Sequence, residues 1–171
     1  VLSLPPVMIA EAHIKGGGIL SIKVEEKTPA LLLKKDTGFN VLSEYGEYIR
    51  SISSREHFSD LPVITGEGAE NAASQATAIF KSISTNLDRV RGLVFVGQRR
   101  WNIIMKSGQV VMLPENDPEQ AIQKILLLDK TEQILSRKIA VFDFRLPSRI
   151  TLRVPSEKYG QINSEVIGVR N

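Results

Sequence analysis

The amino-acid sequence predicts an α+β fold, with a mainly antiparallel sheet and two or three helices packed on it. Short apolar runs recur between Gly, Pro and Asp turn signals, as in strands joined by tight turns. Two longer segments carry apolar residues at helical spacing instead. Because the order is strands, helix, strands, helix and a closing hairpin, the pattern favours this class over a doubly wound sheet.

The composition suits one or two globular domains and narrows the function. The chain has 171 residues, is 42% hydrophobic and contains no Cys, so it can form a core without disulfides and lacks thiol chemistry. Lys and Arg number 22 against 19 Asp and Glu, and this net charge of +3 is spread along the chain. A nucleic-acid binder would concentrate its basic residues. No apolar run approaches the ~20 residues that span a bilayer.

The N-terminal part predicts a hairpin followed by short strands. Residues 7–14 form one strand, and Leu20, Ile22 and Val24 alternate with polar residues, as in a strand with one buried face. The three glycines at 16–18 predict the turn, because glycine adopts positive φ without strain. The runs LLLKK, FNVL and GEYIRSI then predict strands separated by DTG and SEYG.

Two helices are predicted further along the chain. Within residues 67–85 small and apolar side chains form one stripe at helical spacing. A second helix begins after Asp117, with Pro118 at the first helical position and Gln120 three residues after the Asp, an arrangement typical of a capped start. Between the helices, RGLVFV and RRWNIIMKSGQVVMLP predict strands, with a turn at Ser107-Gly108.

The closing hairpin, residues 138–155, can be aligned by its two-faced strands. A three-residue loop at 147–149 keeps the apolar faces together, whereas a two-residue loop would pair Leu146 with Arg149. Burying each large side chain is worth about 1.5 to 3 kcal/mol and an exposed ion pair about 0 to 1, so the apolar face sets the register. The expected pairs are Leu146–Ile150, Phe144–Leu152, Phe142–Val154 and Asp143–Arg153.

The second strand of this hairpin is expected at a sheet edge, because residues 156–171 have weaker alternation. An edge strand offers unpaired backbone groups, and arginines on its solvent face favour an acidic visitor. The sequence therefore predicts that residues 148–154 accept a strand from a partner. Proline at Thr151 is expected to abolish that binding and leave the domain folded.

No catalytic residue, cofactor or metal site is expected. The segment LPVITGEGAENAAS resembles a phosphate-binding loop, but Gly66-x-Gly68 lacks the remaining motif residues, and Glu67 and Glu70 would repel a phosphate. The two histidines lack a convergent ligand set, and no serine lies in Gly-x-Ser-x-Gly. A small hydrolase that uses the glycine turn is the less favoured reading.

Arg99, Arg100 and Trp101 admit two readings. An aromatic beside two cations suits nucleic-acid binding, but single-strand binders present several stacking platforms and this segment has one. We therefore expect Trp101 to anchor the core at the start of a strand while one arginine faces solvent, and no nucleic-acid partner.

Several short motifs, in this order and spacing, resemble the FtsQ/DivIB family of bacterial cell-division proteins. The similarity runs from the first residues to about Val154, and its strongest part is Val24-x-Glu26-x-x-Pro29 followed much later by Arg-Arg-Trp. The motifs are Leu4-Pro5 with Val7, Ala10-Glu11, the alternating Leu20, Ile22 and Val24 with Glu26 and Pro29-Ala30, Leu61-Pro62 with Gly66, Arg99-Arg100-Trp101 with Leu113-Pro114, and Phe142-Asp143-Phe144-Arg145-Leu146.

The resemblance implies a single-pass inner-membrane protein with a periplasmic POTRA domain followed by a β domain. Residues 1–28 would be the C-terminal part of the POTRA domain, 29–155 the β domain and 156–171 a tail. The membrane helix and first POTRA elements would precede this chain. A POTRA remnant of this size is expected to be marginal or partly rearranged.

The resemblance also implies a non-enzymatic scaffold of the divisome. Its terminal strand would recruit the partner FtsB, in complex with FtsL, by strand addition, and Arg145 would pair with an acidic side chain of the visitor. The partner-binding residues carried over by position are Arg145, Leu146, Ser148, Ile150, Thr151 and Val154.

Two departures from the family pattern bear on these expectations. The family has an aromatic-Pro turn where this chain has glycines 16–18, and residues 156–171 have no counterpart, so the tail is a candidate cover for the edge. An alternative reading is a POTRA-type docking or chaperone module of an outer-membrane assembly or secretion system. Such modules carry tandem POTRA repeats, and the sequence shows no internal repeat.

Overall fold

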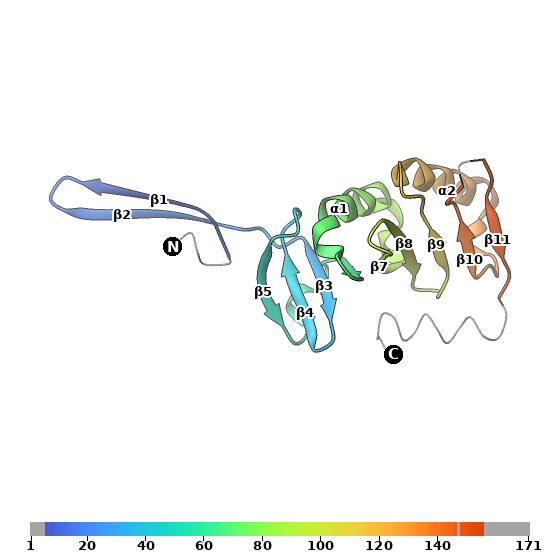
Figure 1. Cartoon of the computed structure of the whole chain (residues 1–171), viewed down its shortest axis with the longest axis horizontal. Helices are drawn as coiled ribbons and strands as arrows, with labels where there is room; N and C mark the ends of the chain where they lie inside the picture. The colour runs from blue at the N-terminus through green and yellow to red at the C-terminus, as the bar shows by residue number, and fades with distance from the viewer. Residues whose placement is uncertain (1–5, 147, 156–171) are drawn as a thin grey trace.

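The computed structural model of the chain describes residues 6–146 and 148–155. Within them, nine strands form one sheet and two form a separate hairpin (Figure 1). The strands are β1 (Val7–Lys15), β2 (Ile19–Glu26), β3 (Leu31–Lys35), β4 (Gly38–Leu42), β5 (Tyr48–Ile52), β6 (Val63–Thr65), β7 (Val90–Val96), β8 (Arg100–Met105), β9 (Val110–Met112), β10 (Val141–Asp143) and β11 (Thr151–Arg153). The α-helices are α1 (Ala73–Ser82) and α2 (Pro118–Glu132), and the 3-10 helices are η1 (Glu56–Phe58), η2 (Ala69–Ala72), η3 (Ser84–Arg89) and η4 (Ile134–Ser136).

The large sheet is mixed but mainly antiparallel, which confirms the predicted α+β class. Its strand order is β11-β10-β9-β8-β7-β6-β3-β4-β5. The parallel neighbours are β3 with β6, β6 with β7, and β9 with β10. Parallel strands need a crossover connection, and the chain supplies one through α1 between β6 and β7 and another through α2 between β9 and β10.

The main core lies between α1, α2 and one face of this sheet (Figure 1). Trp101 is 1% exposed, and its indole N–H donates to the Gln75 Oε1 atom on α1 at 2.9 Å. The expectation that Trp101 anchors the core is therefore confirmed. The stripe predicted for the first helix is confirmed as well, although the segment divides into η2, α1 and η3. Its buried members are Ala69, Ala73, Ala76, Ile79, Phe80 and Ile83.

The opposite face is covered near β3 to β5 by the chain that runs from β5 to β6. A second apolar cluster contains Leu32, Val41, Ile49 and Val63, and Phe58 and Leu61 of this connection pack against it. The connection therefore buries the second face of these strands without an α-helix. At the outer end, β5 pairs with β4 through a register shift between Val41 and Leu42.

The start of α2 differs from the prediction. Pro118 is the first helical residue, as expected, but Asp117 has φ 51° and ψ 50° and makes no side-chain capping bond. A capping side chain needs an extended backbone at its own residue, and the left-handed conformation of Asp117 does not provide one. The Asp117 carbonyl instead accepts the N–H of Gln120 at 3.1 Å.

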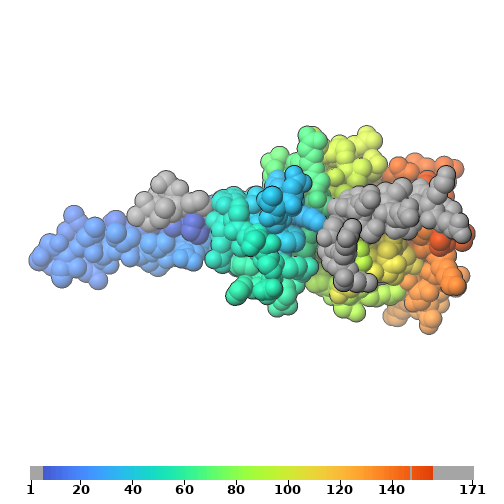
Figure 2. Space-filling view, turned by 90° about the horizontal axis from the view of Figure 1, so that it is seen from below, coloured from blue at the N-terminus to red at the C-terminus, as the bar shows by residue number. Residues whose placement is uncertain are grey.

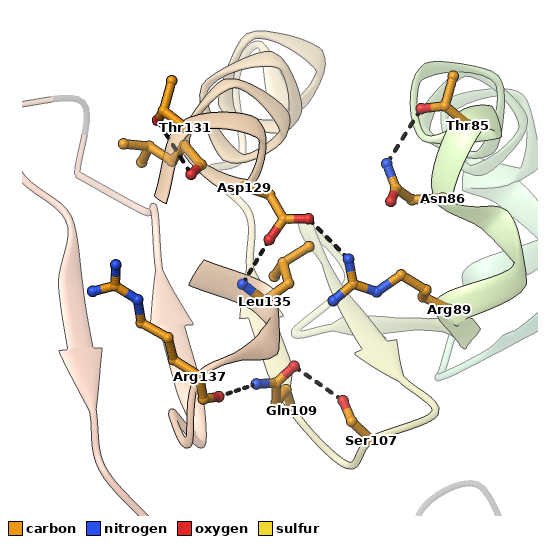
Figure 3. Close-up of polar contacts among 10 residues, drawn as sticks. Thr85, Asn86, Arg89, Ser107, Gln109, Asp129, Thr131, Leu135 and Arg137 are labelled. Carbon is orange, nitrogen blue, oxygen red and sulfur yellow. Dashed lines mark hydrogen bonds and ion pairs between the residues drawn. The ribbon is translucent and has the colours of Figure 1, made fainter. Parts of the chain in front are cut away.

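Polar contacts at the end of α2 hold the chain that leads to β10 (Figure 3). The Asp129 carboxylate accepts a hydrogen bond from Arg89 Nη1 at 2.8 Å and another from the Leu135 backbone N–H at 2.8 Å. The buried Gln109 donates from Nε2 to the Arg137 carbonyl at 2.9 Å. These contacts tie η4 and the residues after it to η3 and to the turn before β9.

The β1–β2 hairpin has the predicted pairing but lacks the predicted burial. It projects away from the body (Figures 1 and 2), and its turn places Gly17 and Gly18 at positive φ. Leu20, Ile22 and Val24, expected on a buried face, are exposed, because these two strands form a sheet of their own that pairs with no other described strand.

The three-residue loop predicted for the closing hairpin is wrong. β10 and β11 pair with Phe142 opposite Leu152 and Asp143 opposite Thr151, so residues 144–150 form the connection. The chain leaves β10 early because the Asp143 carboxylate accepts the backbone N–H two residues later, at 3.1 Å. The expected pairs Leu146–Ile150, Phe144–Leu152, Phe142–Val154 and Asp143–Arg153 are replaced by this register.

The helix layer ends at β10. The expectation that the apolar face of the second hairpin strand is buried is therefore wrong. Phe142 and Phe144 are buried in the main core, and no residue of β11 belongs to it. The two registers differ by two residues, so each strand keeps its predicted faces. The apolar side chains expected to be buried beyond β10 are exposed: Leu146, Ile150, Leu152 and Val154.

Phe142→Ala is expected to lower the free energy of unfolding by about 3 to 5 kcal/mol, because the side chain is 0% exposed and its loss leaves a cavity. Leu152→Ala, at the opposed position, is the matched control; Leu152 is 49% exposed, and the change should stay below about 1 kcal/mol. Urea unfolding followed by circular dichroism measures both. Equal losses would contradict a helix layer that ends at β10.

Candidate partner-binding edge

β11 is the last strand at one end of the described sheet. Along a strand, the backbone groups of successive residues point alternately to the two sides. The Phe144 N–H donates to the Met112 carbonyl on β9 at 2.9 Å, so Phe142 also faces β9. Asp143 therefore faces β11, and pairs there with Thr151.

The same alternation assigns the backbone groups of β11. Thr151 faces β10, and the Arg153 carbonyl accepts the N–H of Ala140 at 2.7 Å. Leu152, between them, points its N–H and carbonyl away from β10. Proline at Thr151 would consequently break the β10–β11 pairing itself, so the expectation that this change leaves the domain intact is corrected.

The predicted site residues gather at this end of the sheet. Arg145, Leu146, Ser148 and Ile150 lie in the connection between β10 and β11, Thr151 begins β11, and Val154 follows it. All six are exposed. Whether the tail, residues 156–171, covers the edge lies outside the described residues.

Arg145 already has an acidic partner within the chain. Its Nε donates to Asp143 Oδ1 at 2.9 Å and its Nη2 to Asp143 Oδ2 at 2.7 Å. These hydrogen bonds are the main reason that the pKa of Asp143 is lowered from its usual value, and burial opposes them. The same contact raises the pKa of the Arg145 guanidinium. Both groups are therefore charged at neutral pH.

A hollow of about 570 Å³ lies beside this pair, and sequence reasoning missed most of its lining. It joins the connection and β11 to the start of β8, so Arg99 and Arg100 lie near Arg145. The buried Nε of Arg100 has no hydrogen-bond partner among the described residues. Only the strand order brings these segments together. The lining residues are Arg99, Arg100, Glu115, Asp143, Arg145, Leu146, Arg149, Thr151 and Arg153.

The residues considered for chemistry are not brought together. In the part of the chain that the structure describes, no three His, Cys, Asp or Glu residues could hold a metal ion. The glycine turn leads into the 3-10 helix η2, and a Cβ on Gly66 would lie 2.3 Å from the Phe95 carbonyl oxygen. Close backbone packing therefore accounts for glycine at this position.

Comparison with known proteins identifies the family. The family model described as cell division protein FtsQ/DivIB, C-terminal, matches residues 30–145. The chain belongs to the FtsQ/DivIB family. It is 36% identical over 152 residues to the cell division protein FtsQ of Jannaschia sp. strain CCS1, covering 89% of this chain and 49% of that protein. It is 37% identical over 162 residues to FtsQ of Paracoccus denitrificans, covering 95% and 48%.

The chain spans about half the length of the curated FtsQ relatives that it matches. Among solved structures, it is similar to the major extracytoplasmic domain of the trans isomer of DivIB from Geobacillus stearothermophilus. That match has a TM-score of 0.43 and 14% identity, and covers 66% of this chain and 99% of the DivIB chain. Neither α-helix in residues 6–146 and 148–155 is long and apolar enough to cross a bilayer.

The Asp143–Arg145 pair predicts a dependence of stability on pH. Because the pKa of Asp143 is lowered in the folded state, the ionised pair stabilises the fold at neutral pH, and this contribution is lost as the pH falls below the carboxyl group's usual value of 3.8. Asp143→Asn should lower the free energy of unfolding at neutral pH, and its difference from the unaltered chain should narrow in acid. Urea titrations across this range measure it; a difference independent of pH would contradict the assignment.

Proposed function

We propose that the chain is part of a non-enzymatic scaffold of the bacterial divisome, and that its C-terminal edge recruits FtsB, in complex with FtsL, by strand addition. The observation that carries the proposal is the terminal position of β11 among the described strands of an FtsQ/DivIB chain. The scaffold lies on the periplasmic side of the inner membrane and is anchored by a single membrane helix outside the residues of this chain.

The backbone of β11 suits an added strand. The outward N–H and carbonyl of Leu152 offer a donor and an acceptor to a visiting chain, and the pairing of Thr151 and Asp143 holds β11 in place behind them. Strand addition obtains affinity from such main-chain bonds and specificity from neighbouring side chains.

The side chains around the edge favour a visitor that is both apolar and acidic. Leu146, Ile150 and Leu152 are exposed beyond the end of the helix layer, where apolar residues of an added strand would continue the core. The hollow beside them is lined by five arginines and two carboxylates. Charge complementarity therefore supports a segment with Glu or Asp on the face that meets the hollow.

The other end of the sheet is less suited to strand addition. β5 pairs with β4 so that Val41 lies opposite Arg50 and Leu42 opposite Tyr48, which leaves Ile49 as an extra residue. Such a bulge bends and twists an edge strand and discourages further pairing.

The exposed hairpin supports the proposal that residues 1–28 belong to a POTRA domain completed by preceding residues of a longer protein. Ala10, Ala12 and Ile14 on β1 lie opposite Val24, Ile22 and Leu20 on β2 and share one face. Ile14 is 81% exposed, and two-stranded ribbons need another layer for stability. Residues 29–155 then form the β domain and residues 156–171 the tail.

Leu152→Pro is expected to abolish binding of an FtsB segment, because proline removes the outward N–H and its ring faces the incoming strand. The domain should stay folded, since proline is tolerated where an edge-strand N–H faces solvent. Calorimetric titration measures the binding, and hydrogen exchange of the unaltered chain should show protection of the Leu152 amide when the segment is added.

Leu152→Ala is the control for this experiment, because it shortens the same side chain and keeps the amide. It should lose much less binding than Leu152→Pro, because it reduces only the apolar contact of this side chain with the visitor. Undiminished binding by a folded Leu152→Pro variant, or protection at a distant surface, would contradict strand addition at β11.

Deletion of residues 1–28 is expected to change the free energy of unfolding of the remaining chain by less than about 1 kcal/mol. The hairpin strands pair with no described strand of the body, and an ion pair between Lys27 and Glu47, at 3.3 Å, links the end of this segment to the body. A pair in which one side chain is exposed, as that of Glu47 is, contributes about 0 to 1 kcal/mol. Urea unfolding of both chains tests the division into domains. Loss of a cooperative transition in the shorter chain would contradict it.

A further inference from the structure

The two carboxylates in the hollow have different relations to its arginines. Asp143 makes two hydrogen bonds to the Arg145 guanidinium, at 2.9 and 2.7 Å, and a third to the Arg145 backbone N–H, at 3.1 Å. Glu115 lines the same hollow, and no hydrogen bond or ion pair joins it to an arginine among the described residues. Of these two carboxylates, Asp143 is the one that holds a particular guanidinium within residues 6–146 and 148–155.

The Asp143 contact leaves part of that guanidinium available. An arginine side chain has five N–H donors in a planar fork, and Asp143 takes one on Nε and one on Nη2. Among the described residues, nothing else accepts a hydrogen bond from the donors on Nη1 or from the second donor on Nη2. These lie on a different edge of the plane, so a second carboxylate can bind without displacing the first.

Because Asp143 is more buried than Arg145, it is better placed to hold the Arg145 guanidinium than to contact a visiting strand. Its side chain is 13% exposed, whereas that of Arg145 is 40% exposed. A visiting carboxylate would reach the arginine first, and it would meet a guanidinium already fixed from behind. A long side chain that is held before binding loses less conformational entropy when the ligand arrives.

We propose that Asp143 is a positioning residue of the partner site: it holds Arg145 so that the free edge of the guanidinium receives a carboxylate of the added strand. This inference rests on the proposed function of the β11 edge. Asp143 does not itself contact the visitor; it acts through Arg145 and through the turn that its backbone contact forms.

An opposite role for Asp143 makes a different kinetic prediction. If Asp143 were a competitor for Arg145, its removal would free the guanidinium, and the acidic segment would dissociate more slowly. If Asp143 positions Arg145, its removal lets the side chain rotate, and dissociation becomes faster. Electrostatic attraction changes mainly the association rate, so the dissociation rate separates the two roles.

The test measures dissociation of an FtsB segment from the full chain by surface plasmon resonance. Asp143→Asn is expected to raise the dissociation rate at least about threefold, and Glu115→Gln, which removes the same charge from the same hollow, to leave it within about twofold. In the unaltered chain Arg145→Ala should weaken binding about tenfold, and in the Asp143→Asn chain by less than about threefold.

Each Glu of the segment is replaced by Gln in turn to identify the carboxylate that binds Arg145. Replacing that Glu should weaken binding to the unaltered chain and cause no further loss of binding to the Arg145→Ala chain. Arg145→Lys serves as a second variant if Asp143→Asn folds poorly. It keeps the charge but cannot make the two parallel hydrogen bonds to Asp143, so it should lose as much binding as Arg145→Ala.

Several results would overturn the proposal. These are slower dissociation from Asp143→Asn, equal changes in the two carboxylate variants, and full binding by Arg145→Lys. Two measurements separate failure of this proposal from failure of the proposed function: binding of the segment by the unaltered chain, and an NMR spectrum of the chain without the segment. If the unaltered chain does not bind the segment, the proposed function is wrong and the positioning role falls with it. If the unaltered chain binds the segment, and the NMR signal of the Arg145 Nε–H is the same in the unaltered chain and in Asp143→Asn, only the positioning role is wrong.

Discussion

Phe142 and the parallel pairing of its backbone with β9 hold the C-terminal end of this sheet together. The side chain is fully buried in the main core, which includes residues of α2, and the N–H of Phe144 continues the pairing one step further along β9. With one side of β10 committed to β9, Asp143 has to face the other way, toward Thr151. The pairing of β10 with β9 therefore sets the direction of each backbone group in β11, and with it the donor and acceptor that Leu152 presents at the edge.

Because β9 and β10 are parallel, a long connection must join them. Polar contacts at the end of α2 hold this connection in place. Asp129 joins the end of α2 to η3 and η4, and Gln109 joins the turn before β9 to the residues that enter β10. These bonds are partly buried, and in such surroundings a satisfied polar network favours one arrangement while a broken one is costly. The position of Arg145 therefore depends on contacts in the layer behind the sheet.

The sequence predicted most strands, both main helices and the apolar stripe of the first helix, because apolar periodicity reports these features directly. It did not reveal the parallel pairs or the hairpin register. Those depend on contacts between distant segments, such as Phe144 with Met112, and on a local turn held by Asp143. The site was found only in part for the same reason: Arg145 lies in the predicted hairpin, whereas Arg99 and Arg100 reach the hollow through strand order. The alternation of apolar and polar residues in β2 and β11 also predicted one buried face for each strand, although the apolar side chains of both are exposed.

The irregular pairing of β5 has a consequence for stoichiometry. A sheet that could be extended at both ends would join copies head to tail and build open fibres. Here the extra residue at Ile49 disturbs one end, while β11 at the other end keeps an unbroken register with β10. If a partner adds its strand at β11, this difference between the two ends of the described sheet favours a complex with one added strand over an open chain of copies.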